Sequence, residues 1–461
     1  MASSIDNLIN VAFREGQDLS GFGLKLGGKG DYRPPQFDAE SLKFEYIDTN
    51  GSYGIDLNGS RFLQKLTFAE SQTFTRATTG TFVGANGQIQ TAAINAPRFT
   101  HDPVTRELQG LLIEEQRTNV IIDSEDLTAA SWKSFSSPDT TVSGPVAGYT
   151  TISFSATSSD RRYPRNTGVG TVAAGEVGFI QARFKPGAGC TTIALGANKG
   201  PNKFLWASFN TDTGISDTYT VSDAGVSEFI SATEVEPNVW ELTVKVTGGD
   251  GEFREIVAHF GDGDSASGLR NNSPIADCDV GFVQFERGDA ATSYIPTAGT
   301  QVTRAADDVF IPGSVNPLTE TQGTIYLEGV ADFGPDGISS IFKINETNTN
   351  YIRISIDGIG SKESQIEVLY RNSTQTPVRS GNLSVPPGSR YKVAFSYNDF
   401  AKEINLAVNG TIYGPVSYTH DVPSVAGEDI VLNTKNNILS DLHLYPEALS
   451  ESELITLTGG T

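Results

Sequence analysis

Apolar residues along this chain fall into short alternating runs. In WELTVKV (240–246) and YKVAFSYN (391–398), every second side chain is apolar or aromatic. Side chains two apart project to the same face of a strand, so this alternation predicts half-buried β-strands. Clusters of Gly, Pro, Asn and Asp, such as 248–251, separate the runs and indicate tight turns. The pattern predicts an all-β fold that contains two β-sandwich (jelly-roll) domains.

Asn-Gly pairs mark where several of these strands reverse. They favour type I′ turns, because both central residues of such a turn need a positive φ. The chain places pairs of this kind at Asn50-Gly51, Asn58-Gly59, Asn86-Gly87 and Asn409-Gly410. Each pair predicts a β-hairpin.

Residues 71–126 form the stretch around which the rest of the chain is organised. An apolar strand begins at 111–113 and continues into Glu114, Glu115 and Arg117. Glu114 and Glu115 point to opposite faces of a strand, so they make a poor catalytic pair. Glu115 and Arg117 share one face and are predicted to form an ion pair.

One short motif in this stretch is repeated later in the chain. Phe74-Thr75-Arg76-Ala77 is echoed by Val302-Thr303-Arg304-Ala305. We expect each copy to lead into a similar edge strand.

Composition divides the chain into four segments. Residues 1–44 are predicted to form an extended attachment arm because they are rich in Gly; a flexible tail is the alternative. Residues 45–125 form a β-rich adaptor, which is too short for an independent sandwich and should pack against a neighbour. Residues 126–300 and 301–461 each carry the strand spacing of one β-sandwich.

The charge balance excludes one class of partner. Asp and Glu number 55 against 33 Lys and Arg, a formal charge of −22, and such a chain repels phosphate backbones. We therefore expect no nucleic acid as partner. Apolar runs stay well below the roughly 18 residues of a membrane span, and the first residues lack a secretory pattern, so we expect no membrane insertion.

Few residues have the spacing that catalysis or metal binding requires. Asp262 and Asp264 in GDGDSASG could ligate Ca²⁺ through alternate carboxylates; a plain Asp/Gly turn is the competing interpretation, because the other ligands of an EF-hand are missing. Beyond this calcium ion we predict no cofactor, and we predict no catalytic residue and no enzymatic activity. Four histidines stand apart from one another, none at metal-ligand spacing: His101, His259, His420 and His443.

The two cysteines, Cys190 and Cys278, are interpreted as reduced, packed thiols. A disulfide between them stays open as the alternative.

Binding of sugars needs exposed aromatic rings together with a few polar groups. The candidates are Trp132, Trp206, Trp240, Tyr219 and Tyr163. Trp206 and Trp240 lie in apolar strand runs and are predicted to anchor the core. Trp132 stands beside a turn and is the candidate ligand-binding residue.

Two sets of motifs resemble known virion proteins. The wording FTRAT…NG…QTA…PRF.HDP…GLLIEEQRTN, within 74–119, resembles a stretch that recurs in tailed-bacteriophage virion proteins in front of a carbohydrate-binding β-sandwich. SEDLTAASWKS (124–134), GFIQARFKPGAG (178–189), PNVWELTVKVTG (237–248) and GFVQFERGDAATSYIPTAGTQVTRAAD (281–307) resemble the phage head-spike-fibre type domain, a family regarded as similar to carbohydrate-binding modules. Its usual Leu-Glu-Ala run is replaced here by Phe285-Glu286-Arg287.

The last segment resembles a different sandwich. RYKVAFSYN…INLAVNG…SDLHLYPEALSESEL, within 390–454, is similar to laminin-G/concanavalin-A-like domains, which end in a last strand and a short closing helix. Ser450 and Glu453 match the capping box that would begin this helix.

These resemblances imply a bacteriophage virion structural protein: a spike, fibre or decoration subunit that attaches to host-surface glycans (polysaccharide). It would contact other virion proteins through residues 1–44, form a homo-oligomer, preferably a trimer, and be assembled into the virion in the bacterial cytoplasm. One alternative is a baseplate or capsid cement protein whose sandwiches bind only neighbouring virion proteins. Another is a polysaccharide depolymerase on the same scaffold, since fold does not fix function.

Overall fold

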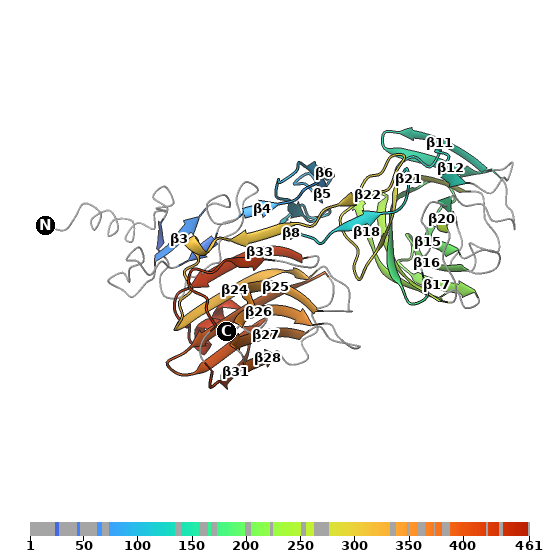
Figure 1. Ribbon diagram of the computed structural model, residues 1–461. Coiled ribbons are helices and arrows are strands. Elements are labelled where there is room, and N and C mark those ends of the chain that lie inside the picture. The colour runs from blue at the N-terminus through green and yellow to red at the C-terminus, as the bar shows by residue number, and fades with distance from the viewer. Residues whose placement is uncertain are drawn as a thin grey trace.

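A computed structural model shows two β-sandwich lobes with strands β5, β6 and β22 between them (Figure 1). The all-β fold class is confirmed. The structure describes residues 73–133, 140–155, 165–166, 173–198, 204–221, 225–249, 255–261, 276–331, 338–347, 350–357, 365–372, 374–379, 388–420, 423–432 and 437–459, together with the strands 24–26, 44–46 and 62–66.

The first sandwich packs two six-stranded antiparallel sheets face to face. One sheet has the order β10 (Trp132–Lys133), β13 (Arg165–Asn166), β20 (Glu255–Gly261), β15 (Thr192–Asn198), β16 (Phe204–Asn210) and β17 (Ser216–Val221). The other has the order β11 (Thr140–Val146), β12 (Tyr149–Phe154), β21 (Ala276–Arg287), β14 (Val177–Pro186), β19 (Val239–Gly248) and β18 (Gly225–Glu236). Alternate residues of both sheets, among them Ile180, Ile193 and Leu242, form one core.

The second sandwich is larger and has its own core. Its ten-stranded sheet runs β1 (Leu24–Leu26), β3 (Phe62–Leu66), β2 (Phe44–Tyr46), β33 (Asn437–Tyr445), β24 (Gln322–Ala331), β29 (Ser389–Asn398), β30 (Glu403–Val408) and β31 (Thr411–Ser417), with β8 (Leu108–Ile113) beside β33 and β7 (Phe99–His101) beside β8. Its seven-stranded sheet runs β28 (Thr374–Arg379), β27 (Gln365–Asn372), β26 (Asn350–Asp357), β25 (Ile338–Thr347), β32 (Ile430–Leu432), β23 (Asp308–Ile311) and β4 (Thr73–Thr75). A short 3₁₀ turn, η2 (Gly313–Val315), follows β23.

Strands from the adaptor segment belong to the second sandwich. Phe74 of β4 pairs with Val309 of β23, and Leu112 of β8 pairs with Ile438 of β33. The second sandwich therefore extends beyond the predicted 301–461, and the first sandwich is inserted between two of its parts. The chain enters and leaves this insertion through β9 (Arg117–Asn119) and β22 (Val302–Arg304), which pair with each other.

Two of the predicted hairpin turns lie in the described part of the chain. Asn409 and Gly410 both have positive φ (47° and 81°) and join β30 to β31, which confirms the type I′ prediction. Asn86-Gly87 lies between β5 (Gly80–Val83) and β6 (Ile89–Ala92), so the hairpin is confirmed, but the turn type is wrong. Here only Gly87 has a positive φ, because the turn is closed from Gly87 N to the Gly84 carbonyl (2.9 Å). Asn50-Gly51 and Asn58-Gly59 lie outside the described residues.

The predicted closing helix is confirmed as α4 (Glu451–Leu457). The carboxylate of Glu453 accepts a hydrogen bond from the Ser450 amide (2.8 Å), as the capping box requires. Leu454 packs with Tyr326 and Tyr445 on the outer face of the ten-stranded sheet. Within the described residues, no helix has the length and apolar character that crossing a membrane would need.

Candidate functional site

A cluster of buried arginines lies where the two sandwiches meet. Arg76 follows β4, Arg98 precedes β7 and Arg304 ends β22; they surround Glu114, which follows β8, and Asp307, which precedes β23. All five side chains are almost completely buried, at 0–1% exposure. These five residues are called the arginine cluster below.

The two carboxylates of the arginine cluster each bind two guanidinium groups. Asp307 accepts from Arg76 Nη1 at 3.0 Å and from Arg98 Nη2. Glu114 accepts from Arg98 Nη1 at 2.7 Å and from Arg304 Nη1. Burial and repulsion from Arg98 lower the pKa of Arg304 to about 9, so it keeps its proton at neutral pH. Three positive charges thus face two negative ones among residues that are almost completely buried.

The expectation that each copy of the repeated motif leads into a similar edge strand is wrong. The first copy leads into β5, which pairs only with β6 among the described strands, whereas the second leads into β23, which lies between β32 and β4 inside the seven-stranded sheet. The two copies do share one property: their arginines, Arg76 and Arg304, both belong to the arginine cluster.

The loop after β21 is fastened to this cluster by Ser293. Its amide and hydroxyl donate to the two oxygens of Glu114 at 2.6 and 2.7 Å. Arg98 Nη1 donates to the same hydroxyl at 2.8 Å. The ATSYIPT motif thus ties the first sandwich to the second through polar contacts.

Further polar contacts surround β9 and β22, the strands through which the chain enters and leaves the insertion. Arg117 pairs with Glu115, as the sequence predicts, and with Asp289 at 3.0 Å. Asn119 Nδ2 donates to the carbonyl of Ile295 at 2.8 Å. These contacts hold β9 against the segment that connects β21 to β22.

Glu286 is a completely buried carboxyl group close to these polar contacts. It accepts hydrogen bonds from the amide of Thr292 at 2.5 Å and from its hydroxyl at 2.7 Å. Burial raises the pKa of Glu286 to about 7. The two hydrogen bonds from Thr292 and the positive charge of Arg117 lower this pKa, but their effect is smaller than that of burial.

Glu286 should make the stability of the protein depend on pH. Its pKa is higher in the folded chain than in the unfolded chain, so its contribution is fully present below about pH 4.5 and is lost as the pH rises through about 7. We expect the difference in free energy of unfolding between the native protein and Glu286→Gln to fall by roughly 3 kcal/mol between pH 4.5 and 8. Urea denaturation across this range measures it. Glu107→Gln, at an exposed site, is the matched control; a pH-independent difference for Glu286→Gln would contradict the assignment.

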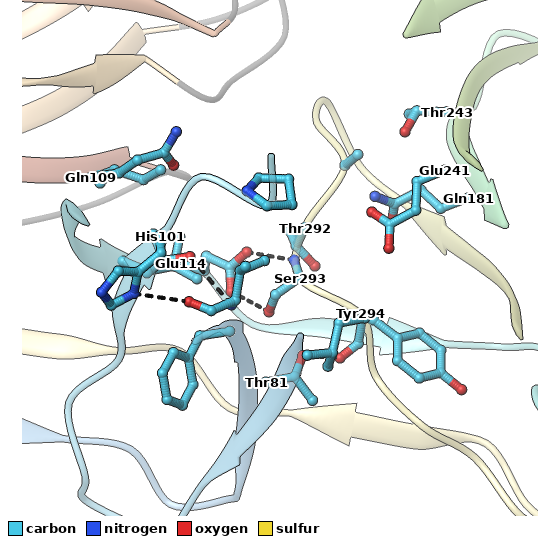
Figure 2. A pocket seen from close by; sticks show the side chains of 18 of the residues that line it. Thr81, His101, Gln109, Glu114, Gln181, Glu241, Thr243, Thr292, Ser293 and Tyr294 are labelled. Atoms are coloured by element: carbon cyan, nitrogen blue, oxygen red, sulfur yellow. Dashed lines mark hydrogen bonds between the residues drawn. The ribbon is translucent and has the colours of Figure 1, made fainter. Parts of the chain in front are cut away.

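A cleft of about 280 Å³ opens beside the arginine cluster. In Figure 2, Glu114 and Ser293 lie side by side near the centre of the view. Gln181, Glu241 and Thr243 come from the first sandwich, and His101 and Gln109 lie on the opposite side. The cleft is therefore bounded by both sandwiches. We call it the junction cleft.

A larger groove of about 450 Å³ lies on the other side of Tyr294, and we call it the tyrosine groove. Phe282 and Tyr294 line both hollows and stack with ring centroids 4.1 Å apart and planes inclined by 21°. The remaining polar lining of the tyrosine groove is Thr81, Gln88, Thr91, Glu125, Tyr149, Arg183 and Glu236.

Tyr149 and Arg183 approach each other across Gly281 in the floor of the tyrosine groove. A β-carbon at Gly281 would lie 3.2 Å from both the Tyr149 ring and the Arg183 Cδ, so glycine makes this approach possible. Burial raises the pKa of the Tyr149 hydroxyl, and a hydrogen bond with Arg183 opposes the shift. The guanidinium of Arg183 also lies over the Phe282 ring, 5.6 Å from its centroid.

Carboxylates with a free oxygen line the same groove. Glu125 Oε1 accepts from the Tyr294 hydroxyl (3.1 Å) and Glu236 Oε1 accepts from Gln88 Nε2 (2.6 Å). The structure gives neither of their second oxygens a partner among the described residues. Together with the half-buried Tyr149 ring, they form a surface of one aromatic face and several hydrogen-bond acceptors.

The structure does not support Trp132 as an exposed ligand-binding residue. Its side chain is 6% exposed, packs in the core of the first sandwich and donates Nε1–H to the Asp123 carbonyl at 2.8 Å. The prediction failed because the segment before Trp132 supplies the acceptor for the indole N–H, and the ring packs inward. Trp240 packs against the core, which confirms its structural interpretation. Trp206 is fully buried, but its strand neighbours Leu205 and Ala207 belong to the core, so its ring lies on the opposite face of β16 and does not anchor the core as predicted. Tyr219 lies against Trp206, with ring centroids 6.1 Å apart.

The remaining candidates are only partly covered by the structure. Asp262 and Asp264, the candidate calcium ligands, and Tyr163 lie outside the described residues. Among the residues that the structure describes, no group of three or more His, Cys, Asp or Glu could hold a metal ion. Cys190 and Cys278 are free, buried thiols that share a core, and burial raises the pKa of Cys278.

Sequence reasoning missed the tyrosine groove. Tyr149, Arg183 and Glu236 lie on strands β12, β14 and β18, and no local pattern connects them. The only available signal was GFVQFERGDAATSYIPT, which supplies Gly281, Phe282 and Tyr294.

The fold and this site define a two-sandwich protein with a polar, aromatic-floored groove at the junction. No protein-family model matches the chain, and no curated protein matches it.

Solved structures that resemble part of this chain include carbohydrate-binding-module and sialidase-related β-sandwich domains and a pentraxin. A Ruminococcus gnavus IT-sialidase CBM40 bound to alpha2,3 sialyllactose is 17% identical, with 31% of this chain and 84% of that chain covered and a TM-score of 0.27. A leech intramolecular trans-sialidase is 23% identical (31% and 24% covered, TM-score 0.27), and a SAP-like pentraxin from Limulus polyphemus is 17% identical (30% and 71% covered, TM-score 0.25). At these identities and scores the likeness carries no functional argument.

Proposed function

We propose that this protein binds glycans through the tyrosine groove and does so as a structural component of a bacteriophage virion. The observation that supports binding is the groove itself: the Tyr149 ring, the Gln88 amide and the carboxylates of Glu125 and Glu236 line one cavity of about 450 Å³. Sugar-binding sites combine an aromatic platform with a few directed polar groups in this way. Host-surface polysaccharide is the partner that this chemistry fits.

The virion setting rests on sequence resemblance. The motifs FTRAT, PRF, GLLIEEQRTN and ATSYIPT, which resemble phage virion proteins, supply Arg76, Arg98, Glu114 and Ser293. These residues form the junction between the sandwiches, so in our proposal the resemblance in sequence corresponds to a shared architecture. Attachment to other virion proteins through residues 1–44 and a homotrimeric assembly complete it.

Tyr149→Ala should weaken glycan binding about tenfold or more. Removal of an aromatic anchor at the centre of a binding site costs more than 1 kcal/mol, and 1.4 kcal/mol corresponds to tenfold. A glycan array with the full chain identifies the ligands, and calorimetry measures the affinities. Tyr149→Phe keeps the ring and should retain most of the binding.

Tyr351→Ala, a half-buried tyrosine of the second sandwich, is the matched control and should leave affinity unchanged. Equal losses for both tyrosine variants, or no binding of any glycan by the native protein, would contradict the proposal. Binding of virion proteins in the absence of any glycan ligand would favour a baseplate or cement role.

The depolymerase alternative has one specific observation in its favour. Glu125 and Glu236 line the same groove, and hydrolysis of a glycosidic bond uses two carboxyl groups. A reducing-sugar assay with host envelope polysaccharide separates the two functions: we expect no release of reducing ends. Release that is abolished by Glu236→Gln would make the protein an enzyme.

A further inference from the structure

We infer that the tyrosine groove takes a neutral or amino-substituted saccharide and discriminates against saccharides that carry carboxylates. This inference rests on the proposed function and narrows the class of ligand that the same site binds. It follows from the charges and hydrogen bonds of the groove.

The only cation among the described lining residues of the groove is already engaged. Arg183 donates from Nε (3.0 Å) and Nη2 (2.5 Å) to one oxygen of Glu241 and bonds with Tyr149. Its side chain is 13% exposed, and its positive charge is cancelled by Glu241. An acidic sugar would have to displace this pair to gain a guanidinium partner.

The charges that remain are negative. Glu125 and Glu236 both line the groove, and the chain supplies no second cation to it within the described residues. The charge of Glu125 raises the pKa of Tyr294, and the charges of Glu236 and Glu241 raise the pKa of Tyr149. The negative potential of these carboxylates therefore reaches the aromatic groups that would hold the ligand. A ligand carboxylate would therefore meet like charges in a half-enclosed site, where repulsion is stronger than in water.

The hydrogen-bonding capacity points the same way. The free oxygens of Glu125 and Glu236 can only accept, and hydroxyl or ammonium groups of a sugar donate. Hydrogen bonds to a charged group are the stronger ones, and an ammonium adds direct charge attraction. A sugar with hydroxyl and amino donors satisfies these acceptors, whereas a carboxylate leaves them unpaired.

Three oligosaccharides of equal length test the inference: a glucosamine oligomer, its N-acetylated neutral counterpart and a uronic acid oligomer. Calorimetry with the full chain at neutral pH and low salt should give the glucosamine or the neutral oligomer at least tenfold tighter binding than the uronic acid oligomer. Any advantage of the glucosamine oligomer over the neutral one should shrink in 1 M salt, because screening weakens charge attraction.

The double variant Glu125→Gln/Glu236→Gln should reduce the discrimination against the uronic acid oligomer about tenfold. Asp308→Asn/Glu107→Gln removes the same number of charges at two exposed sites away from this groove and should leave the discrimination unchanged.

The outcomes separate the two levels of the argument. Tightest binding of the uronic acid oligomer, or an equal effect of both double variants, would overturn this inference while the proposed glycan binding stands. Failure of all three oligosaccharides and of the glycan array to bind would overturn both.

Discussion

Asp307→Asn should destabilise the protein by about 3–5 kcal/mol. The two oxygens of Asp307 accept from Arg76, from Arg98 and from the amide of Glu114 (2.9 Å). Without this carboxylate, three buried guanidinium groups would share the single charge of Glu114, and a buried charge without a counter-ion is costly. Urea denaturation followed by circular dichroism measures the change.

Asp308→Asn is the control, because Asp308 is the neighbouring residue and is exposed. It should change stability by less than about 0.5 kcal/mol. Equal stability of Asp307→Asn and Asp308→Asn would mean that the arginine cluster does not depend on its charge balance. Fluorescence adds information, since all three tryptophans lie between positions 132 and 240 and report on the first sandwich alone.

Trp206→Ala should cost about 3–5 kcal/mol, the usual range for truncation of a large buried aromatic residue. Trp206 is completely buried, and its Cδ1 lies 2.1 Å from where a Gly196 β-carbon would be, so the ring occupies the space left by that glycine. Alanine would leave a cavity over the middle of β15 and β16. Thermal and urea denaturation measure the loss, and Trp206→Phe should lose distinctly less.

Glycan affinity provides the second readout for Trp206. Because the ring is buried, the folded Trp206→Ala protein should bind with unchanged affinity at low temperature. Full stability combined with lost binding would instead make Trp206 a ligand-contacting residue.

Local features of the fold could be predicted from the sequence. The capping box of Ser450 and Glu453, the hairpin at Asn409-Gly410 and the ion pair of Glu115 with Arg117 all depend on residues within three positions of one another. Spacing along the chain determines such contacts once the local conformation is known.

The arginine cluster could not be predicted in the same way. Arg76 and Asp307 are 231 positions apart, and Arg304 and Glu114 are 190 apart. No periodicity marks a contact of this range, because it depends on how the sandwiches pack. The repeated motif did single out Arg76 and Arg304, although it predicted similar strands and not a shared ionic site.

Exposure was the least predictable property. Trp132 stands beside a turn and yet is buried, whereas Tyr149 follows the turn between β11 and β12 and lines the groove. Whether a turn residue faces solvent depends on which sheet the neighbouring loop covers, and this is decided by packing between distant strands.

The pairing of β9 with β22 has a consequence for how this protein can vary. Asn119 lies opposite Val302, so the inserted first sandwich is joined to the larger sandwich through a single pair of adjacent strands. The first sandwich is thus a self-contained insertion: recombination at this strand pair would exchange it for another domain while the larger sandwich stays complete. A fragment that begins at residue 301, by contrast, would lack β4 and β8, which are strands of the larger sandwich.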